Sequence, residues 1–219
     1  MLIKLDIYGE IMKLTPIQKA ILFNCLRQGF YFFLCILFAL SLRILANYFK
    51  EATFQEFGIV ENLQLTILAL SAVSFGYLAH LSQKFRPLLV LFSSLCAFAC
   101  CREMDSFFDA HVPFISWKFC YLFPLLAGCY LFQKRKKLKK ILFLFCTSPA
   151  FYIMCSAMIV FIPLAQAIGN KGFISTVLPD AHDVILMRRF FEESGEILAY
   201  FLLFLSSIEF YISLIYKKK

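Results

Sequence analysis

Charged residues are scarce in this sequence of 219 residues. Only 16% are Asp, Glu, Lys or Arg, whereas 61% are apolar and the mean hydropathy is +0.77. Soluble domains contain about 25% charged residues and about half apolar ones. A chain this apolar has too little polar surface to cover itself in water, which excludes a soluble globular domain. We therefore expect an all-α fold, a polytopic transmembrane helix bundle.

Familiar functional motifs are also lacking. The eight glycines form no P-loop and no G-x-G-x-x-G, and G-x-S-x-G and H-E-x-x-H are absent. The nine cysteines are odd in number, contain no C-x-x-C and lie in or beside apolar runs, which indicates neither a disulfide framework nor a zinc site. Without a linker-like stretch, we expect a cytoplasmic segment 1–28, one transmembrane domain 29–216 and a basic tail 217–219.

Apolar residues gather in six segments. The third and fourth are shorter than the roughly 20 residues of a typical crossing and need their polar flanks to span the bilayer, so four or five crossings are an alternative. Before the first segment, Thr15 and Pro16 predict a helix N-cap and the first helical residue. The six segments are Gly29–Phe49, Ile59–Leu81, Leu88–Cys101, Trp117–Phe132, Lys140–Pro163 and Glu196–Tyr216.

Basic residues indicate the orientation of these segments. Fifteen of the 22 Lys and Arg residues fall before the first segment, after the second, after the fourth and in the tail. These are alternate compartments if all six segments cross, and the positive-inside rule places them, with both termini, in the cytoplasm. We attribute the net charge of +8 to topology rather than to nucleic acid. The partners that we expect are the lipid bilayer and, at the basic loop 134–140, anionic lipid.

Acidic residues show the opposite bias. Eleven of the fourteen Asp and Glu residues fall on the non-cytoplasmic side, although acidic residues contribute little to orientation. At helical spacing, Glu61 and Gln64 share one face of the second segment, and Glu192, Glu196 and Tyr200 share one face of the last. A polar stripe that enters a crossing should face other helices or a cavity rather than lipid.

These polar residues predict a site at the outer membrane surface, with three kinds of candidate. The candidate acids and bases for catalysis are Glu103, Asp105, Asp109 and Glu193. The candidate binding residues are Glu61, Gln64, Arg102, Arg188, Arg189, Glu192, Glu196 and Tyr200. The candidate ligands for a divalent cation are Asp109, His111 and His182. The alternatives are a structural network of ion pairs and unrelated surface charge.

Three stretches, Arg102-Glu103-Met104-Asp105, Ser148-Pro149-Ala150-Phe151 and Glu192-Glu193 through Glu196 to Tyr200, occur in this order. Over residues 60–210 the chain resembles a family of uncharacterised polytopic inner-membrane proteins of bacteria. The resemblance implies a multi-pass protein of the bacterial inner membrane and assigns no reaction.

The functional expectation is an integral membrane protein whose outer acidic site binds a cation or a lipid headgroup. One alternative is a hydrolase or transferase that acts on a lipid-linked substrate at the outer leaflet. The other is a small ion- or proton-coupled transporter or a subunit of a membrane complex, in which the intramembrane Glu209 would take part.

Overall fold

The computed structural model describes residues 15–49, 58–105, 108, 117–168, 170, 172, 176 and 181–216. Within these residues every regular element is a helix, which confirms the all-α prediction. Four of the described helices are long and apolar enough to cross a membrane. The chain divides into two compact units, residues 1–44 and 45–219, and each is considered by itself.

Helix α2 (Pro16–Phe49) begins where the sequence predicts. The backbone N–H of Gln18 donates to Oγ1 of Thr15 over 3.3 Å, and the backbone N–H of Thr15 donates to Oε1 of Gln18 over 2.9 Å. This reciprocal capping box satisfies donors that a helix start leaves unpaired. Beyond it, Leu26 and Phe32 are among many large apolar side chains that stay exposed. Such a surface suits lipid rather than water.

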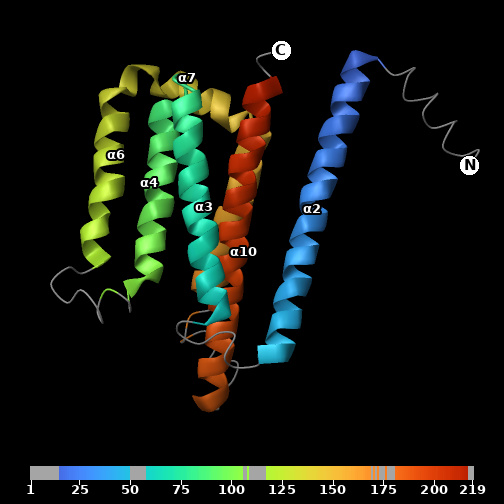
Figure 1. Cartoon of the computed structure of the whole chain (residues 1–219), viewed down its shortest axis with the longest axis vertical. Helices are drawn as coiled ribbons and strands as arrows, with labels where there is room; N and C mark the ends of the chain where they lie inside the picture. Colours follow the sequence, from blue (N-terminus) through green and yellow to red (C-terminus); the bar gives the residue numbers. More distant parts are fainter. Residues whose placement is uncertain are drawn as a thin grey trace, which may run out of the picture. The chain divides into compact units, whose positions relative to one another are not determined.

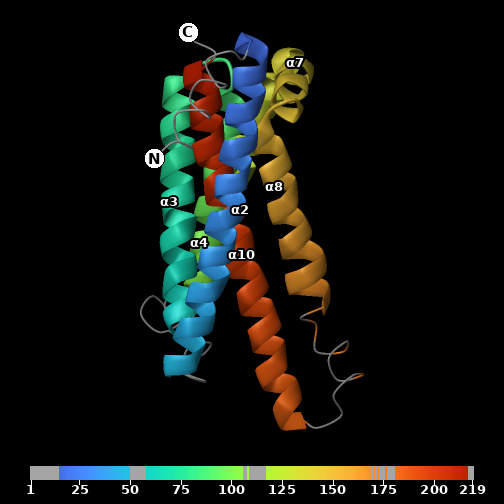
Figure 2. The same ribbon diagram turned by 90° about the vertical axis from the view of Figure 1, so that its right-hand side faces the viewer.

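Helices α3, α4 and α10 form the centre of the second unit (Figures 1 and 2). Helix α3 packs against α4 on one side and α10 on the other, α6 packs on α4, and α8 and η3 pack on α10. The helices of this unit are α3 (Ile59–Leu81), α4 (Arg86–Glu103), η2 (Trp117–Tyr121), α6 (Leu122–Gln133), α7 (Arg135–Cys146), α8 (Pro149–Ile159), the π-helix η3 (Val160–Ile168) and α10 (Ala181–Tyr216).

Small hydroxyl side chains join these helices. Ser93 of α4 donates to the backbone oxygen of Ala72 in α3 over 2.7 Å. Ser206 of α10 donates to the backbone oxygen of Ala150 in α8 over 2.8 Å. In an apolar bundle, small residues allow helices to approach closely and hydroxyl groups bind across the contact. These bonds fix α4 relative to α3 and α8 relative to α10.

The predicted fifth segment, Lys140–Pro163, is wrong as one helix. Helix α7 ends at Cys146, and α8 begins at Pro149. Ser148 between them has extended backbone (φ −91°, ψ 147°), as the residue before a proline prefers. The membrane-length helix therefore runs from Pro149 to Ala167. The preceding α7 lies across one end of the bundle instead (Figure 1).

Residues 135–140 of the predicted basic loop are thus the first half of α7 rather than a loop. Ile141 and Phe145 of α7 are buried in the apolar core, where the ring of Phe145 lies 5.6 Å from that of Phe210 in α10. The basic side chains of α7 are exposed. This separation of apolar and basic faces is typical of a helix at a membrane surface.

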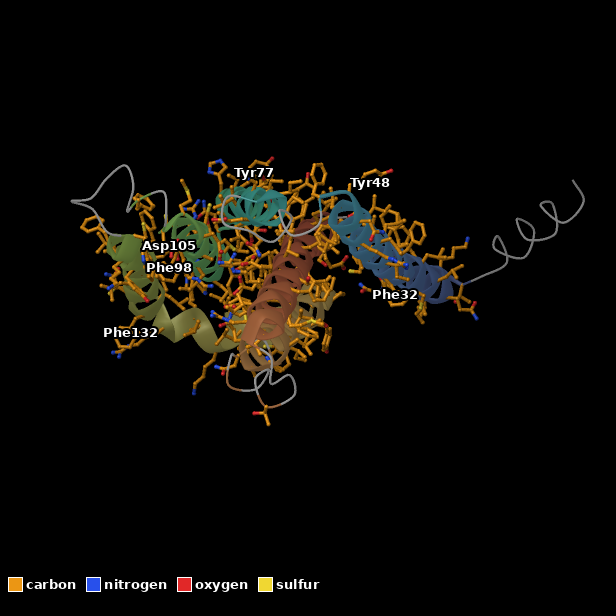
Figure 3. All side chains as sticks on the ribbon, turned by 90° about the horizontal axis from the view of Figure 1, so that it is seen from below. Phe32, Tyr48, Tyr77, Phe98, Asp105 and Phe132 are labelled. Atoms are coloured by element: carbon orange, nitrogen blue, oxygen red, sulfur yellow. The ribbon has the colours of Figure 1, made fainter. Side chains whose placement is uncertain are left out.

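The predicted third and fourth segments both form helices, α4 and the pair η2–α6, but neither qualifies among the four membrane-length helices. At about 1.5 Å per residue, the 18 residues of α4 extend about 27 Å, slightly less than the roughly 30 Å hydrocarbon core. Large side chains such as Tyr77 of α3 and Phe132 of α6 project outward from the bundle (Figure 3). An apolar exterior surrounds this unit as it does α2.

Candidate functional site

Polar side chains from four helices meet near the ends of α3 and α4, where α10 crosses them. Helix α3 contributes Gln64 from the buried face that also carries Leu68 and Ser71, and all three are fully buried. Helix α4 contributes its last residues, Arg102 and Glu103. The remaining members come from η3 and α10. We call the set the polar cluster: Gln64, Arg102, Glu103, Gln166, Glu193, Glu196 and Tyr200.

Arg102 and Glu196 form the centre of the polar cluster. Nη2 of Arg102 lies 3.1 Å from Oε1 of Glu196 and 3.6 Å from Oε1 of Glu103. The Glu196 side chain is 3% exposed, whereas that of Arg102 is 38% exposed. Nε2 of Gln166 donates to the same Glu196 oxygen over 2.6 Å. One buried carboxylate therefore binds both a guanidinium and an amide.

Tyr200 connects α10 to the second carboxylate of the cluster. Its hydroxyl donates to Oε1 of Glu103 over 2.9 Å, and only 5% of Tyr200 is exposed. Glu103 lies past the predicted third crossing, Leu88–Cys101. Burial raises the pKa of the Glu103 carboxyl above its usual value, whereas the Arg102 guanidinium and the Tyr200 hydroxyl act to lower it.

Gln64 holds the third carboxylate. Its Nε2 donates to Oε2 of Glu193 over 2.8 Å and makes a longer contact of 3.4 Å with the backbone oxygen of Glu193. Since a carboxylate accepts hydrogen bonds and does not donate them, the amide nitrogen of Gln64 is the atom that contacts Glu193, and Oε1 makes no contact of this kind with it. Within the described residues this buried Oε1 has no hydrogen-bond partner.

Gly195 explains how η3 comes close enough to donate to Glu196. A Cβ atom at Gly195 would lie 2.8 Å from Cβ of Ala165, closer than real Cβ contacts, and 3.0 Å from its Cα, which is tighter than most. Pro163 lies inside η3 and lacks a backbone N–H, which suits a segment with an irregular hydrogen-bond pattern. The π-helix and the missing Cβ together bring Gln166 against α10.

An apolar cavity of about 320 Å³ ends at the polar cluster. Its wall is formed by α3, α4, α8, η3 and α10, with side chains such as Leu68, Met154 and Leu203. Arg102 and Tyr200 are its polar lining residues, and both bind carboxylates of the cluster. The cavity is thus an apolar chamber with a charged, hydrogen-bonding end.

Several predicted binding and catalytic residues come together in the polar cluster: Gln64, Arg102, Glu103, Glu193, Glu196 and Tyr200. Gln166 was not predicted. Its only signal in the sequence is a lone amide in the apolar run after Pro163.

Other predicted residues lie apart from the cavity lining. Arg188 and Glu192 bind each other over 3.1 Å along the more exposed start of α10. Asp105 is exposed (Figure 3), and Glu61 is half-buried in the first turn of α3. Arg189 is half-buried on α10. None of these five positions forms the cavity wall in the described part of the chain.

The predicted metal ligands lie outside what the structure describes. Asp109 and His111 fall outside the described residues, and for His182 only the backbone is described. Among the described residues, no group of three or more His, Cys, Asp or Glu side chains is arranged to hold a metal ion.

Comparison with protein-family models, with curated proteins and with solved structures found no match.

Proposed function

We propose that this protein binds an amphiphile, with an apolar chain in the cavity and a polar head at the polar cluster. The observation that carries the proposal is the continuity between the two: Arg102 and Tyr200 line the cavity and bind the carboxylates beyond it. A volume of about 320 Å³ falls within the range of about 300–1,000 Å³ typical of small-molecule sites. A lipid or a lipid-linked molecule has this division between chain and head.

The same proposal includes six crossings with both termini in the cytoplasm. The 18-residue α4 and the 17 residues of η2 and α6 together extend nearly the thickness of the hydrocarbon core, and their polar flanks supply the rest. The exposed basic face of α7 supports a cytoplasmic position for that end of the bundle. The polar cluster, at the opposite ends of α3 and α4, then faces the outer leaflet.

The membrane we propose is the bacterial inner membrane, because the resemblance in residues 60–210 is to bacterial inner-membrane proteins. Single cysteines in a cysteine-free background test the orientation at Gln55, Asp109 and Lys137. A thiol reagent added outside intact cells should label positions 55 and 109. It should label position 137 only after the cells are permeabilised. Labelling of position 137 in intact cells would contradict the orientation.

The binding proposal is tested with full-length protein in lipid nanodiscs and a photoactivatable dodecyl alcohol. We expect crosslinks at cavity residues such as Met154 and Leu203. Replacing Ala157, which lines the cavity and is 3% exposed, with Phe should fill the chamber and remove these crosslinks. Ala69→Phe is the matched control, because Ala69 is exposed on α3. Equal crosslinking in both variants would contradict the proposal.

A second candidate is a hydrolase or transferase acting on the bound amphiphile. The three carboxylates of the polar cluster favour it, since Glu103 lies beside Arg102 and binds a cavity-lining tyrosine. In this candidate Glu103 would serve as an acid or base at the head group. Product release from a lipid-linked substrate that stops in Glu103→Gln, with chain crosslinking retained, would support it. Unchanged product release in that variant would exclude Glu103 as the acid or base of the reaction.

A further inference from the structure

The polar cluster contains more acceptors of hydrogen bonds than donors. Among its seven residues the cationic side chain is Arg102, which contacts the carboxylates of Glu196 and Glu103, and the third carboxylate, Glu193, accepts from the amide of Gln64. Within this set, one guanidinium thus faces three carboxyl groups. A phosphate or carboxylate brought here would add a like charge in a partly buried setting.

Gln64 provides a second and independent indication. Its side chain is fully buried, its nitrogen is fixed by Glu193, and its oxygen has no hydrogen-bond partner among the described residues. A buried acceptor without a donor carries an energetic cost that a bound donor would remove. Gln64 lies one helical turn before Leu68, a residue of the cavity wall, on the same face of α3.

We propose that the head group bound at the polar cluster is a primary ammonium that donates hydrogen bonds to Gln64 and to the neighbouring carboxylates. This inference rests on the proposed binding of an amphiphile and narrows it to one chemical class, an aliphatic amine or amino lipid. The cavity holds the chain, and the amine reaches past Arg102 and Tyr200 at the end of the cavity to Gln64 and the carboxyl groups, which do not themselves line it among the described residues. Arg102 and Tyr200, at the boundary, hold the carboxylates in place through the bonds described above.

Primary ammonium fits these acceptors better than related heads do. It has three N–H donors and a positive charge, so it offers bonds to Gln64 and to carboxylates at once. A trimethylammonium carries the charge without any donor, and a hydroxyl carries one donor without charge. Amphiphiles that share one alkyl chain and differ only in these head groups therefore distinguish the contribution of charge from that of hydrogen-bond donation.

The test is displacement of the photoactivatable dodecyl alcohol from full-length protein in nanodiscs. The competitors are dodecylammonium, dodecyltrimethylammonium, dodecanol and dodecyl phosphate, compared at equal mole fraction in the lipid. Dodecylammonium should displace the probe at a mole fraction at least about tenfold below that of dodecyl phosphate, which corresponds to about 1.4 kcal/mol. It should also displace it at a lower mole fraction than the trimethylated amine and the alcohol.

Substitutions in the polar cluster test whether it causes the preference for dodecylammonium. Gln64→Leu and Glu193→Gln should remove most of the preference for dodecylammonium while dodecanol still displaces the probe, which shows that the cavity remains intact. Glu192→Gln is the control, since Glu192 pairs with Arg188 away from the cavity and differs from Glu193 by one position. Because the charge of Glu192 acts on Glu193 and Glu196 without a hydrogen bond to Gln64, the preference should fall less in this control than in Glu193→Gln.

The outcomes distinguish the two proposals. Equal displacement by all four competitors, or strongest displacement by dodecyl phosphate, would overturn the ammonium head while leaving amphiphile binding intact. Displacement by the trimethylated amine as strong as by dodecylammonium would overturn hydrogen-bond donation by the head. If the probe fails to crosslink at the cavity and no competitor has an effect, amphiphile binding itself is wrong.

Discussion

Replacing Gly195 with Ala should loosen the contact that positions Gln166. The added Cβ would lie 2.8 Å from Cβ of Ala165, whereas ordinary contacts begin near 3.4 Å, so η3 and α10 must separate by about 0.6 Å. Overpacking of this kind costs about 1–3 kcal/mol. The loss outweighs the gain of up to about 1 kcal/mol that Ala brings over Gly inside a helix. Separation would also draw Gln166 away from Glu196, a bond now 2.6 Å long.

Reversible unfolding in SDS-containing mixed micelles measures this loss of stability. Gly128→Ala in α6 is the matched control, because a Cβ at Gly128 meets nothing within 4 Å, and it should be neutral or slightly stabilising. Adding Ala165→Gly to the Gly195→Ala variant should restore part of the stability. The Ala165→Gly substitution removes the Cβ atom at 2.8 Å, whereas the backbone Cα and N atoms at 3.0 and 3.2 Å remain. A Gly195→Ala variant as stable as Gly128→Ala would refute this account of the close approach.

Three further predictions concern charged residues. Arg102→Gln should lower the free energy of unfolding by about 1–3 kcal/mol because Glu196 stays buried with fewer donors, and adding Glu196→Gln should recover part of it in the same SDS titration; no loss would show that the pair is dispensable. Glu209→Gln should leave dodecyl crosslinking unchanged, since Glu209 is not among the described residues of the cavity wall and lies about 20 Å along α10 from Glu196; lost crosslinking would connect Glu209 to the cavity. Exchanging Lys136 and Lys139 for Gln should weaken retention of phosphatidylglycerol in native mass spectrometry by about 1 kcal/mol each, and unchanged retention would place anionic lipid elsewhere.

Much of the fold could be predicted because it depends on local signals. The start of α2 was predicted from Thr15 and Pro16, and the buried face of α3 follows from the spacing of its polar residues. The helical character of the described residues follows from composition, since helices satisfy their own backbone groups in lipid. These features require no knowledge of which helices touch.

The division of the fifth segment was less visible, although Ser148-Pro149 marks its position. Proline inside an apolar run is compatible with a kink or with two helices, and the run alone does not distinguish them. Here the basic first half of α7 has polar and apolar faces of its own, and Phe145 packs beside Phe210 at the end of the bundle. Tertiary contacts thus separate α7 from α8.

The sequence predicted most residues of the polar cluster, but it did not predict which of them contact one another. Helical spacing identifies Gln64 and Glu196 as residues on inward faces, but not that Glu193 rather than Glu192 meets Gln64. Neighbouring residues on a helix point about 100° apart, and only the crossing of α3 and α10 decides which one faces inward. Gln166 and the cavity depend on the π-helix and on the close approach at Gly195, which no spacing rule reveals.

The interpretation as a structural ion network accounts for only part of the cluster. Arg102, Gln166 and Glu196 form such a network, because each donor meets the same buried carboxylate. A network that served only to join helices would pair its buried polar atoms, since an unpaired buried acceptor is destabilising. Glu193 instead takes its hydrogen bond from a neutral amide whose oxygen lacks a partner among the described residues. This imbalance lies next to an apolar cavity, and a ligand with a donating head and an apolar chain would correct the first while filling the second.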